Sequence, residues 1–436
     1  MMRRRTALTT LSLGLLASCS TPAPKIAGLQ IPVLPDTGDL AVSANAPGVT
    51  LPPARALPSW PQPLANAAHA PGNVAAPTGL SVRWSTSVGM GGGFRQPLLA
   101  SPVMAQGMVF AMDANAMVSA HAAVDGRRLW HAPTRPPHTT EQNIGGGLAY
   151  DNGRLYVSTG YGQLIAMEAS NGKVLWRQTL EFPARTAPMV AGSLVALISQ
   201  NDLLLTFDAH SGTPGWRFTG QLGTPGSTAV AVTGAPAFAD GIVVAGFASG
   251  MLAALDANSG TPVWEQSYAS SFGQASLLDF SDIVGAPVIA NGVVYAISLG
   301  DTVMAVDLHS GAKVWSHNAS GTQALCLAGD FAFVLDQTQT LYAIHTDDGL
   351  VSWALQMRPF HNMKNKTGPV QWAGPVLVNG MLVLTSSDGE IAFVDAVPGV
   401  LKTTAKLAGK AADLPPIAAG GLLLQLTRDG KLTAYN

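Results

Sequence analysis

The chain has 436 residues, a formal net charge of -2 at pH 7, 47% hydrophobic residues and only 11% charged residues. Because it has no basic excess to neutralise phosphates, we expect no nucleic-acid partner. Two cysteines, Cys19 and Cys326, exclude a disulfide framework. Past the N-terminus, no apolar run approaches the roughly 20 residues of a membrane span. The 47 glycines and 30 prolines favour tight turns over long helices.

The N-terminus has the pattern of a secretory signal. Three arginines (3–5) precede an apolar run at 7–17, which is too short to span a bilayer. The run ends in Leu16-Ala17-Ser18-Cys19, which matches the bacterial lipobox. We therefore predict a lipoprotein signal peptide at 1–18 and acyl chains of the palmitate type on Cys19. Resemblance to other lipoproteins with Ser rather than Asp after the cysteine implies the periplasmic face of the outer membrane. An ordinary signal peptide cleaved near Ala17 is the alternative.

Residues 19–57 are rich in Pro, Ala and Gly without sustained periodicity, so we predict a flexible tether between the lipid and a folded domain at 58–436. The character of the sequence changes near Pro58. We expect the stretch 59–70 to lie ordered against the domain, with Trp60 buried and His69 packed and hydrogen-bonded rather than acting as a ligand.

One hairpin pattern recurs along the rest of the chain. In ALDANSGTPVW (254–264), Asp256 ends a strand, Ser259-Gly260 suits a primed turn, and Trp264 follows in the next strand. The glycine and tryptophan offsets return at 120–130, 166–176, 206–216, 305–315 and 343–353. The copy at 393–403 keeps the aspartate and the glycine but has Thr403 in place of tryptophan.

Each copy belongs to a unit of four short strands separated by Gly-containing turns, which is the layout of a propeller blade. The spacing from Trp315 to Trp353 is 38 residues and that from Trp264 to Trp315 is 51. Propeller loops absorb such variation, whereas solenoid coils do not. The last unit, 421–436, ends after three strands, and 81–87 supplies a lone strand. We therefore predict an all-β, eight-bladed β-propeller of four-stranded antiparallel blades, closed by pairing of the N- and C-terminal strands.

The repeated residues favour structural roles. Aspartates at one equivalent position should accept backbone hydrogen bonds at the turn, and the tryptophans should pack between blades. Cys326 is expected to be a buried strand residue. The glycine clusters at 89–94 and 143–147 lack the strand–turn–helix context of a nucleotide site. No metal or catalytic spacing is present, so we predict no cofactor and no enzymatic activity.

The Asp/Asn-x-x-x-Gly-x-x-x-Trp hairpins resemble the quinoprotein-type (PQQ-like) repeat. Beyond them, 60–62, 145–169, 281–298 and 366–380 are similar to the BamB family of outer-membrane assembly lipoproteins, particularly its alphaproteobacterial form. This resemblance implies a scaffold of the β-barrel assembly complex that docks to the POTRA domains of a BamA-like subunit as a monomer within a hetero-complex.

The resemblance also implies two docking loops. One family loop carries Ser-Asp-x-Asp, to which Ser281 and Asp282 correspond, with Val284 at the second aspartate. The other carries Leu-x-Leu-Arg, to which 228–231 corresponds without the arginine, including Thr228 and Val230. Two alternatives stay open, a periplasmic PQQ-dependent oxidoreductase and an adaptor of another envelope complex. The oxidoreductase would require an adjacent cysteine pair, which the chain lacks.

Overall fold

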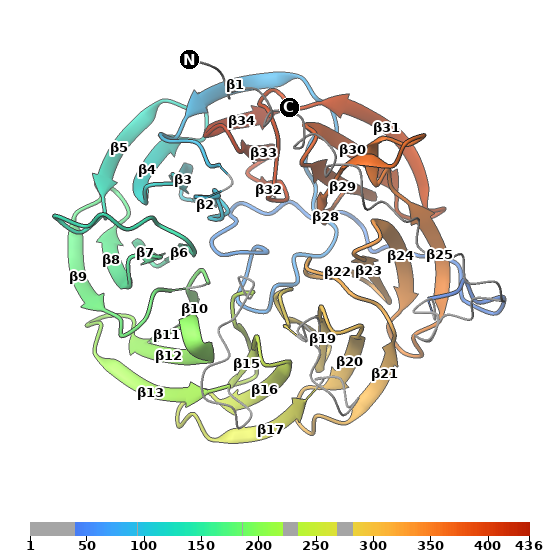
Figure 1. The fold of residues 1–436 in the computed structure, drawn as a ribbon, viewed down its shortest axis with the longest axis horizontal. Helices are drawn as coiled ribbons and strands as arrows, with labels where there is room; N and C mark the ends of the chain where they lie inside the picture. The colour runs from blue at the N-terminus through green and yellow to red at the C-terminus, as the bar shows by residue number, and fades with distance from the viewer. Residues whose placement is uncertain (1–39, 94, 185, 221–233, 268–281) are drawn as a thin grey trace, which may run out of the picture. The chain divides into compact units, whose positions relative to one another are not determined.

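The computed structural model describes residues 40–93, 95–184, 186–220, 234–267 and 282–436. In these ranges all strands but two form eight four-stranded antiparallel sheets, set around one axis (Figure 1). The predicted eight-bladed propeller is therefore confirmed. The described part of the chain holds no helix with the length and apolarity that crossing a bilayer requires. The predicted signal peptide, the predicted acylation site Cys19 and the start of the predicted tether lie outside the described residues.

In each blade the strands follow one another from the axis to the rim. Blades 1 to 4 consist of β2 (Val103–Ala105), β3 (Met108–Met112), β4 (Met117–Ala122), β5 (Arg128–Pro133); β6 (Gly146–Asp151), β7 (Arg154–Thr159), β8 (Gln163–Glu168), β9 (Val174–Thr179); β10 (Met189–Ala191), β11 (Leu194–Ser199), the short 3-10 helix η1 (Gln200–Asp202), β12 (Leu203–Asp208), β13 (Pro214–Thr219); and β14 (Ala237–Ala239), β15 (Ile242–Gly246), β16 (Met251–Asp256), β17 (Pro262–Ser267).

Blades 5 to 8 repeat this order. They consist of β18 (Val288–Ala290), β19 (Val293–Ile297), β20 (Val303–Asp307), β21 (Lys313–His317); β22 (Cys326–Ala328), β23 (Phe331–Leu335), β24 (Thr340–His345), β25 (Val351–Gln356); β28 (Trp372–Val378), β29 (Met381–Ser386), β30 (Glu390–Asp395), β31 (Val400–Lys406); and β32 (Ile417–Ala419), β33 (Leu422–Thr427), β34 (Lys431–Tyr435), with β1 (Val82–Ser87) outermost. The two remaining strands, β26 (Phe360–Asn362) and β27 (Thr367–Pro369), pair with each other between blades 6 and 7.

The hairpin between the third and fourth strands is organised by its aspartate, as blade 4 shows. Asp256 Oδ1 accepts hydrogen bonds from the Asn258 N–H (3.1 Å), the Ser259 N–H (2.8 Å) and the Ser259 hydroxyl (2.8 Å). These bonds, led by that of the hydroxyl, lower the pKa of Asp256. Within this turn only Gly260 has a positive φ, of 71°. The expected primed turn is therefore wrong, because the carboxylate holds a longer loop that ends in a left-handed glycine and a bulge.

The tryptophan that follows each hairpin packs on the next blade, as predicted. Trp264 Nε1 donates a hydrogen bond to the Leu308 carbonyl of blade 5 at 2.7 Å. Its indole covers Gly311, where a Cβ would lie only 2.8 Å from the ring. Gly311 thus meets two needs, a left-handed φ of 69° and the close approach of the indole.

Six other junctions use the same bond, from a tryptophan Nε1 to a carbonyl of the next blade at 2.7–3.2 Å: Trp84 to Ala123, Trp130 to Ala169, Trp176 to Ala209, Trp216 to Ala257, Trp315 to Thr346 and Trp353 to Ala396. The junction between blades 7 and 8 differs, because β34 and β1 come from opposite ends of the chain and no hairpin joins them. Thr403 stands at the tryptophan position there and is exposed. The missing tryptophan therefore marks the closure of the ring.

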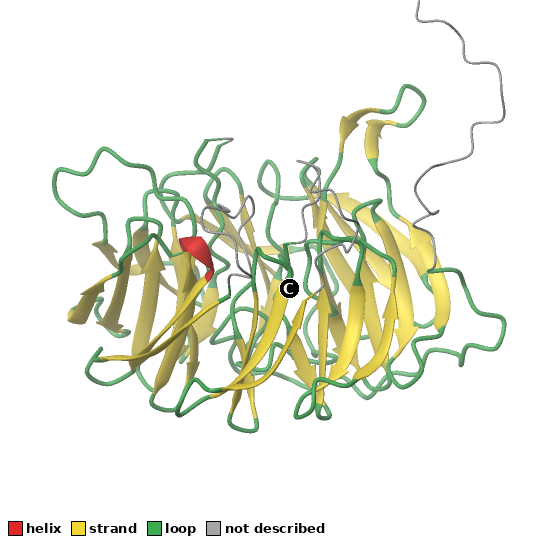
Figure 2. Cartoon of the chain, turned by 60° about the horizontal axis from the view of Figure 1, so that its bottom comes forward, coloured by secondary structure: helices red, strands yellow, loops and turns green. Residues whose placement is uncertain are grey.

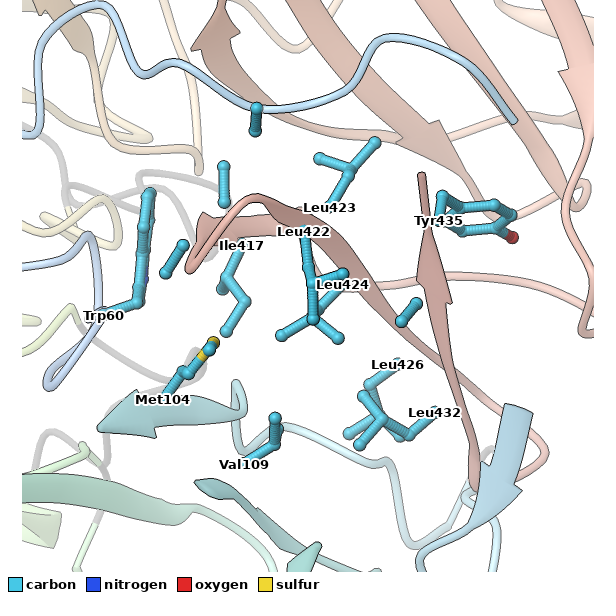
Figure 3. Packing of buried hydrophobic residues seen from close by; sticks show 14 of the residues in the cluster. Trp60, Met104, Val109, Ile417, Leu422, Leu423, Leu424, Leu426, Leu432 and Tyr435 are labelled. Atoms are coloured by element: carbon cyan, nitrogen blue, oxygen red, sulfur yellow. The ribbon is translucent and has the colours of Figure 1, made fainter. Parts of the chain in front are cut away.

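Closure is achieved by backbone pairing and by a shared core. β1 pairs antiparallel with β34, and the Asn436 N–H donates to the Ser81 carbonyl at 3.0 Å. Behind this pair, Leu424, Leu426 and Leu432 of blade 8 belong to one buried cluster with Val109 of blade 1 (Figure 3). The predicted pairing of the N- and C-terminal strands is confirmed.

The segment from Leu57 to Val74 runs once around the inside of the ring and bonds to the inner strands of seven blades. Its contacts, in order, are Leu57 with Gly420, Trp60 with Met104, Pro61 with Tyr150, Gln62 with Val190, Ala67 with Phe238, Ala68 with Ile289 and Val74 with Leu377 (2.7–3.0 Å). It thereby satisfies polar groups on strand edges that would otherwise lack partners. Trp60 is 1% exposed, as predicted.

The predicted tether is shorter than expected at its C-terminal end. Ser43 donates its N–H to the Val351 carbonyl at 2.8 Å, and Ser352 donates its hydroxyl to the Pro47 carbonyl at 2.8 Å. Arg55 bonds to both neighbours of Val74 along the chain. Residues 40–57 therefore lie along the ring rather than forming a flexible tether. Their small and proline residues suit an extended path from the outer edge of blade 6 to its inner turn at Gly329.

Candidate docking face

The two faces of the ring carry different loops. Antiparallel strands alternate in direction, so every link from the outer strand of one blade to the inner strand of the next lies on the same face. We call it the connection face; its described segments are 88–93, 95–102, 134–145, 180–184, 186–188, 234–236, 282–287, 318–325, 357–371 and 407–416. The opposite face carries the Gly–Trp hairpins and is called the hairpin face.

Of the positions predicted to bind a partner, Asp282 lies in a described segment of the connection face. Thr228, Val230 and Ser281 lie outside the described residues. Asp282 is described and is only 5% exposed, and its carbonyl accepts the Leu299 N–H at 2.8 Å. The side chain of Asp282 is therefore buried within the loop. Its neighbour Ile283 is fully buried beside Gly246 of blade 4, which draws this part of the loop into the core.

A cavity of about 210 Å³ opens at the centre of the ring. The N-terminal segment contributes Trp60, Pro63 and Leu64 to its lining. The other lining residues lie in or just before several inner strands: Leu99, Ser101, Gly146, Thr186, Ala187, Gly234, Ala235, Ala286, Val376, Leu414, Pro415, Pro416 and Ile417. Most of these side chains are apolar. The cavity is smaller than the roughly 300–1,000 Å³ of drug-sized ligand pockets, so it suits one apolar group.

The buried titratable groups near the axis have structural roles. His69 Nδ1 lies 2.8 Å from the Pro287 carbonyl, and burial lowers the pKa of His69 to about 4, so the ring is neutral at pH 7. The predicted packed histidine is confirmed. Burial raises the pKa of the Cys326 thiol to about 12, which leaves it unreactive. Among the described residues, no group of three His, Cys, Asp or Glu side chains could hold a metal ion.

The hairpin β26–β27, which projects beyond the blades of the connection face, was not predicted (Figure 2). A signal for it was present. The stretch from Gly349 to Ser387 contains no Asp or Glu but includes Arg358, Lys364 and Lys366. Such a charge imbalance is unusual in a chain with balanced charges, and it interrupts the repeat.

Known proteins resemble the chain in both sequence and fold. The profile of the family described as "Outer membrane protein assembly factor BamB" matches residues 114–355, more than half of the chain. The chain is 28% identical to the outer membrane protein assembly factor BamB of Escherichia coli (strain K12), over 81% of this chain and 87% of that protein. It is 25% identical to the corresponding factor of Bordetella pertussis, over 81% of this chain and 86% of that protein.

Two solved structures share the fold. BamB from Moraxella catarrhalis superposes with a TM-score of 0.68 at 20% identity, over 82% of this chain and 100% of that chain. The quinohemoprotein alcohol dehydrogenase of Comamonas testosteroni superposes with a TM-score of 0.67 at 14% identity, over 87% of this chain and 80% of that chain. The two scores are nearly equal, so the fold by itself does not separate an assembly factor from a dehydrogenase.

The structural use of the repeated aspartates and tryptophans leaves the loops as the variable part of the molecule. This defines a propeller of the quinoprotein-type repeat. The sequence match makes the assignment specific: the chain belongs to the BamB family, whose members are outer-membrane protein assembly factors and not enzymes.

Proposed function

We propose that the chain is a scaffold lipoprotein of the outer-membrane β-barrel assembly complex, and that it docks onto the periplasmic POTRA domains of a BamA-like subunit. In this role it assists the folding and insertion of outer-membrane proteins, as a monomer within the hetero-complex. The observation that carries the proposal is the family match over residues 114–355, which spans blades 2 to 5 and extends into blades 1 and 6.

The connection face is the proposed docking surface. In the sequence, Thr228 and Val230 precede blade 4 and Ser281 precedes blade 5. The central cavity is lined by Ala235 and Ala286, which stand two residues before the inner strands of these blades. A rigid ring that presents loops on one face loses little conformational entropy on binding, which favours a scaffold role. In this proposal Asp282 stabilises the loop and does not contact the partner, because its side chain is buried.

The anchor is the second part of the proposal. Acyl chains on Cys19 would hold the protein to the periplasmic face of the outer membrane, since two or more chains anchor stably. Replacement of the acylated cysteine, Cys19→Ala, should move the protein from the outer-membrane fraction to the soluble periplasmic fraction. Retention of the variant in the membrane fraction would contradict the anchor.

Co-purification tests the docking. A tagged full-length chain should recover the barrel-assembly subunit from detergent-solubilised membranes, whereas a tagged lipoprotein of unrelated fold should not. Repeated absence of that subunit, with the tagged chain itself recovered intact, would refute the proposed function. Substituting a charge into the docking loop, Val230→Glu, should reduce recovery without lowering the thermal stability of the chain.

A further inference from the structure

The hairpin β26–β27 stands on the connection face and is composed almost entirely of exposed residues. Phe360 pairs with Pro369, and Asn362 pairs with Thr367. All nine residues from His361 to Pro369 are exposed. A two-stranded hairpin is marginal by itself in water, so its shape must be held from its base.

The base is fixed by ion pairs and a buried indole. Arg358 contacts Asp388 and Glu390, each at 2.7 Å. Trp372 Nε1 donates to the Arg358 carbonyl at 2.9 Å, and this indole is buried. The hydrogen bond and ion pair to Asp388 raise the pKa of Arg358, so the base stays charged and paired. The hairpin is therefore joined to blade 7 as a rigid projection.

The tip differs from the base in its charges. At the base, Asp388 also contacts His361, and Glu390 also contacts Lys406. Lys364 and Lys366 form no ion pair with any described residue. Between the strands, Met363 is 54% exposed, an unusual position for a large apolar side chain. The tip thus presents two uncompensated cations beside one apolar side chain.

We propose that this tip contacts an acidic surface of the assembly partner, as a second point of docking on the connection face. The inference rests on the proposed function. A protein partner fits better than a membrane because the base is rigid, which holds the tip in one place. Two lysines and one methionine would also add only a weak attraction to a lipid surface. Methionine is enriched at protein interfaces, and lysines at a rim guide association.

Charge reversal at the tip tests the proposal. We would measure the affinity of the full chain for the soluble periplasmic part of the barrel-assembly subunit, at low and at high salt. The double variant Lys364→Glu/Lys366→Glu should bind about tenfold more weakly at low salt, since exposed charge pairs are each worth about 0.2–1 kcal/mol and reversal adds repulsion. The difference should shrink at high salt, where the Debye length falls to about 3 Å at 1 M.

The matched control is Lys173→Glu/Lys313→Glu, which makes the same change in net charge on exposed lysines of the hairpin face. It should alter the affinity less than twofold. Equal affinities for the two double variants would overturn the proposal. A second outcome would also overturn it. In that outcome the Lys364→Glu/Lys366→Glu substitutions leave the partner affinity unchanged but, in the unacylated Cys19→Ala chain, reduce sedimentation with vesicles of phosphatidylethanolamine and phosphatidylglycerol. If the unaltered chain does not bind the subunit, the proposed function fails, and the tip contact fails with it.

Discussion

The junction between blades 4 and 5 gives a sharp test of how the ring is fastened. In the variant Gly311→Ala, the new Cβ would lie 2.8 Å from the Trp264 ring. Carbon atoms in contact prefer about 3.5–4.0 Å, so the indole must move by about 1 Å. That movement strains the 2.7 Å bond from Trp264 Nε1 to the Leu308 carbonyl.

The expected cost has three parts. An alanine in the left-handed region costs about 1–2 kcal/mol, overpacking of the indole about 1–3 kcal/mol, and a weakened buried hydrogen bond about 1 kcal/mol. The control Gly292→Ala lies in the same blade at a φ of 74°, and no atom lies within 4 Å of its added Cβ. The control therefore loses only the first part. We expect Gly311→Ala to be less stable than Gly292→Ala by about 2–4 kcal/mol.

Urea unfolding followed by circular dichroism would measure the two free energies of unfolding. Equal midpoints and slopes for both variants would show that the indole yields freely, and that the tryptophan does not fasten the blades. A third variant, Trp264→Phe, keeps an aromatic ring but removes the N–H. It should lose about 1 kcal/mol because the Leu308 carbonyl is then left without its donor.

Three other sites give further tests. Thr403→Trp should change the free energy of unfolding by less than about 0.5 kcal/mol because blade 8 offers no hairpin to cover, whereas Trp353→Thr should cost about 3–5 kcal/mol; a clear gain from the added tryptophan would contradict this account of ring closure. The pKa of His69 is about 4 in the folded chain, against 6.5 for an unperturbed histidine, so the unfolded chain binds more protons between these values. Stability should therefore be complete above pH 6.5 and fall as the pH decreases toward 4, by about 3 kcal/mol, and a pH titration of His69→Gln should lack this component. Asp282→Arg should lower the melting temperature by burying a large cation, and an unchanged melting temperature would show that the position is open.

Much of the fold could be predicted because each blade is specified locally. The aspartate, glycine and tryptophan of one hairpin, such as Asp256, Gly260 and Trp264, are close in sequence and recur in register. The ring closure could also be predicted, because the strand missing from the C-terminus was supplied at Val82–Ser87. Local signals were sufficient for both.

The path of residues 40–74 could not be predicted, because most of its bonds join backbone groups far apart in sequence. Ala67 and Ala68, for example, bond to Phe238 and Ile289 through their carbonyls. No side-chain pattern encodes such bonds. The burial of Asp282 was missed for a related reason, since it depends on Ile283 entering the core beside blade 4.

Part of the N-terminal segment lies on the face of the ring opposite the proposed docking surface. Pro52 lies beside Gly329, and Leu51 beside Gly380, in turns of the hairpin face. This part of the described N-terminal segment therefore lies on the hairpin face, while the β26–β27 hairpin lies on the connection face, the proposed docking surface. The inner lap from Leu57 to Val74 then bonds this segment to seven blades. A pull on the proposed anchor would thereby be distributed over the ring instead of acting on the β1–β34 pair, whose two strands no hairpin joins.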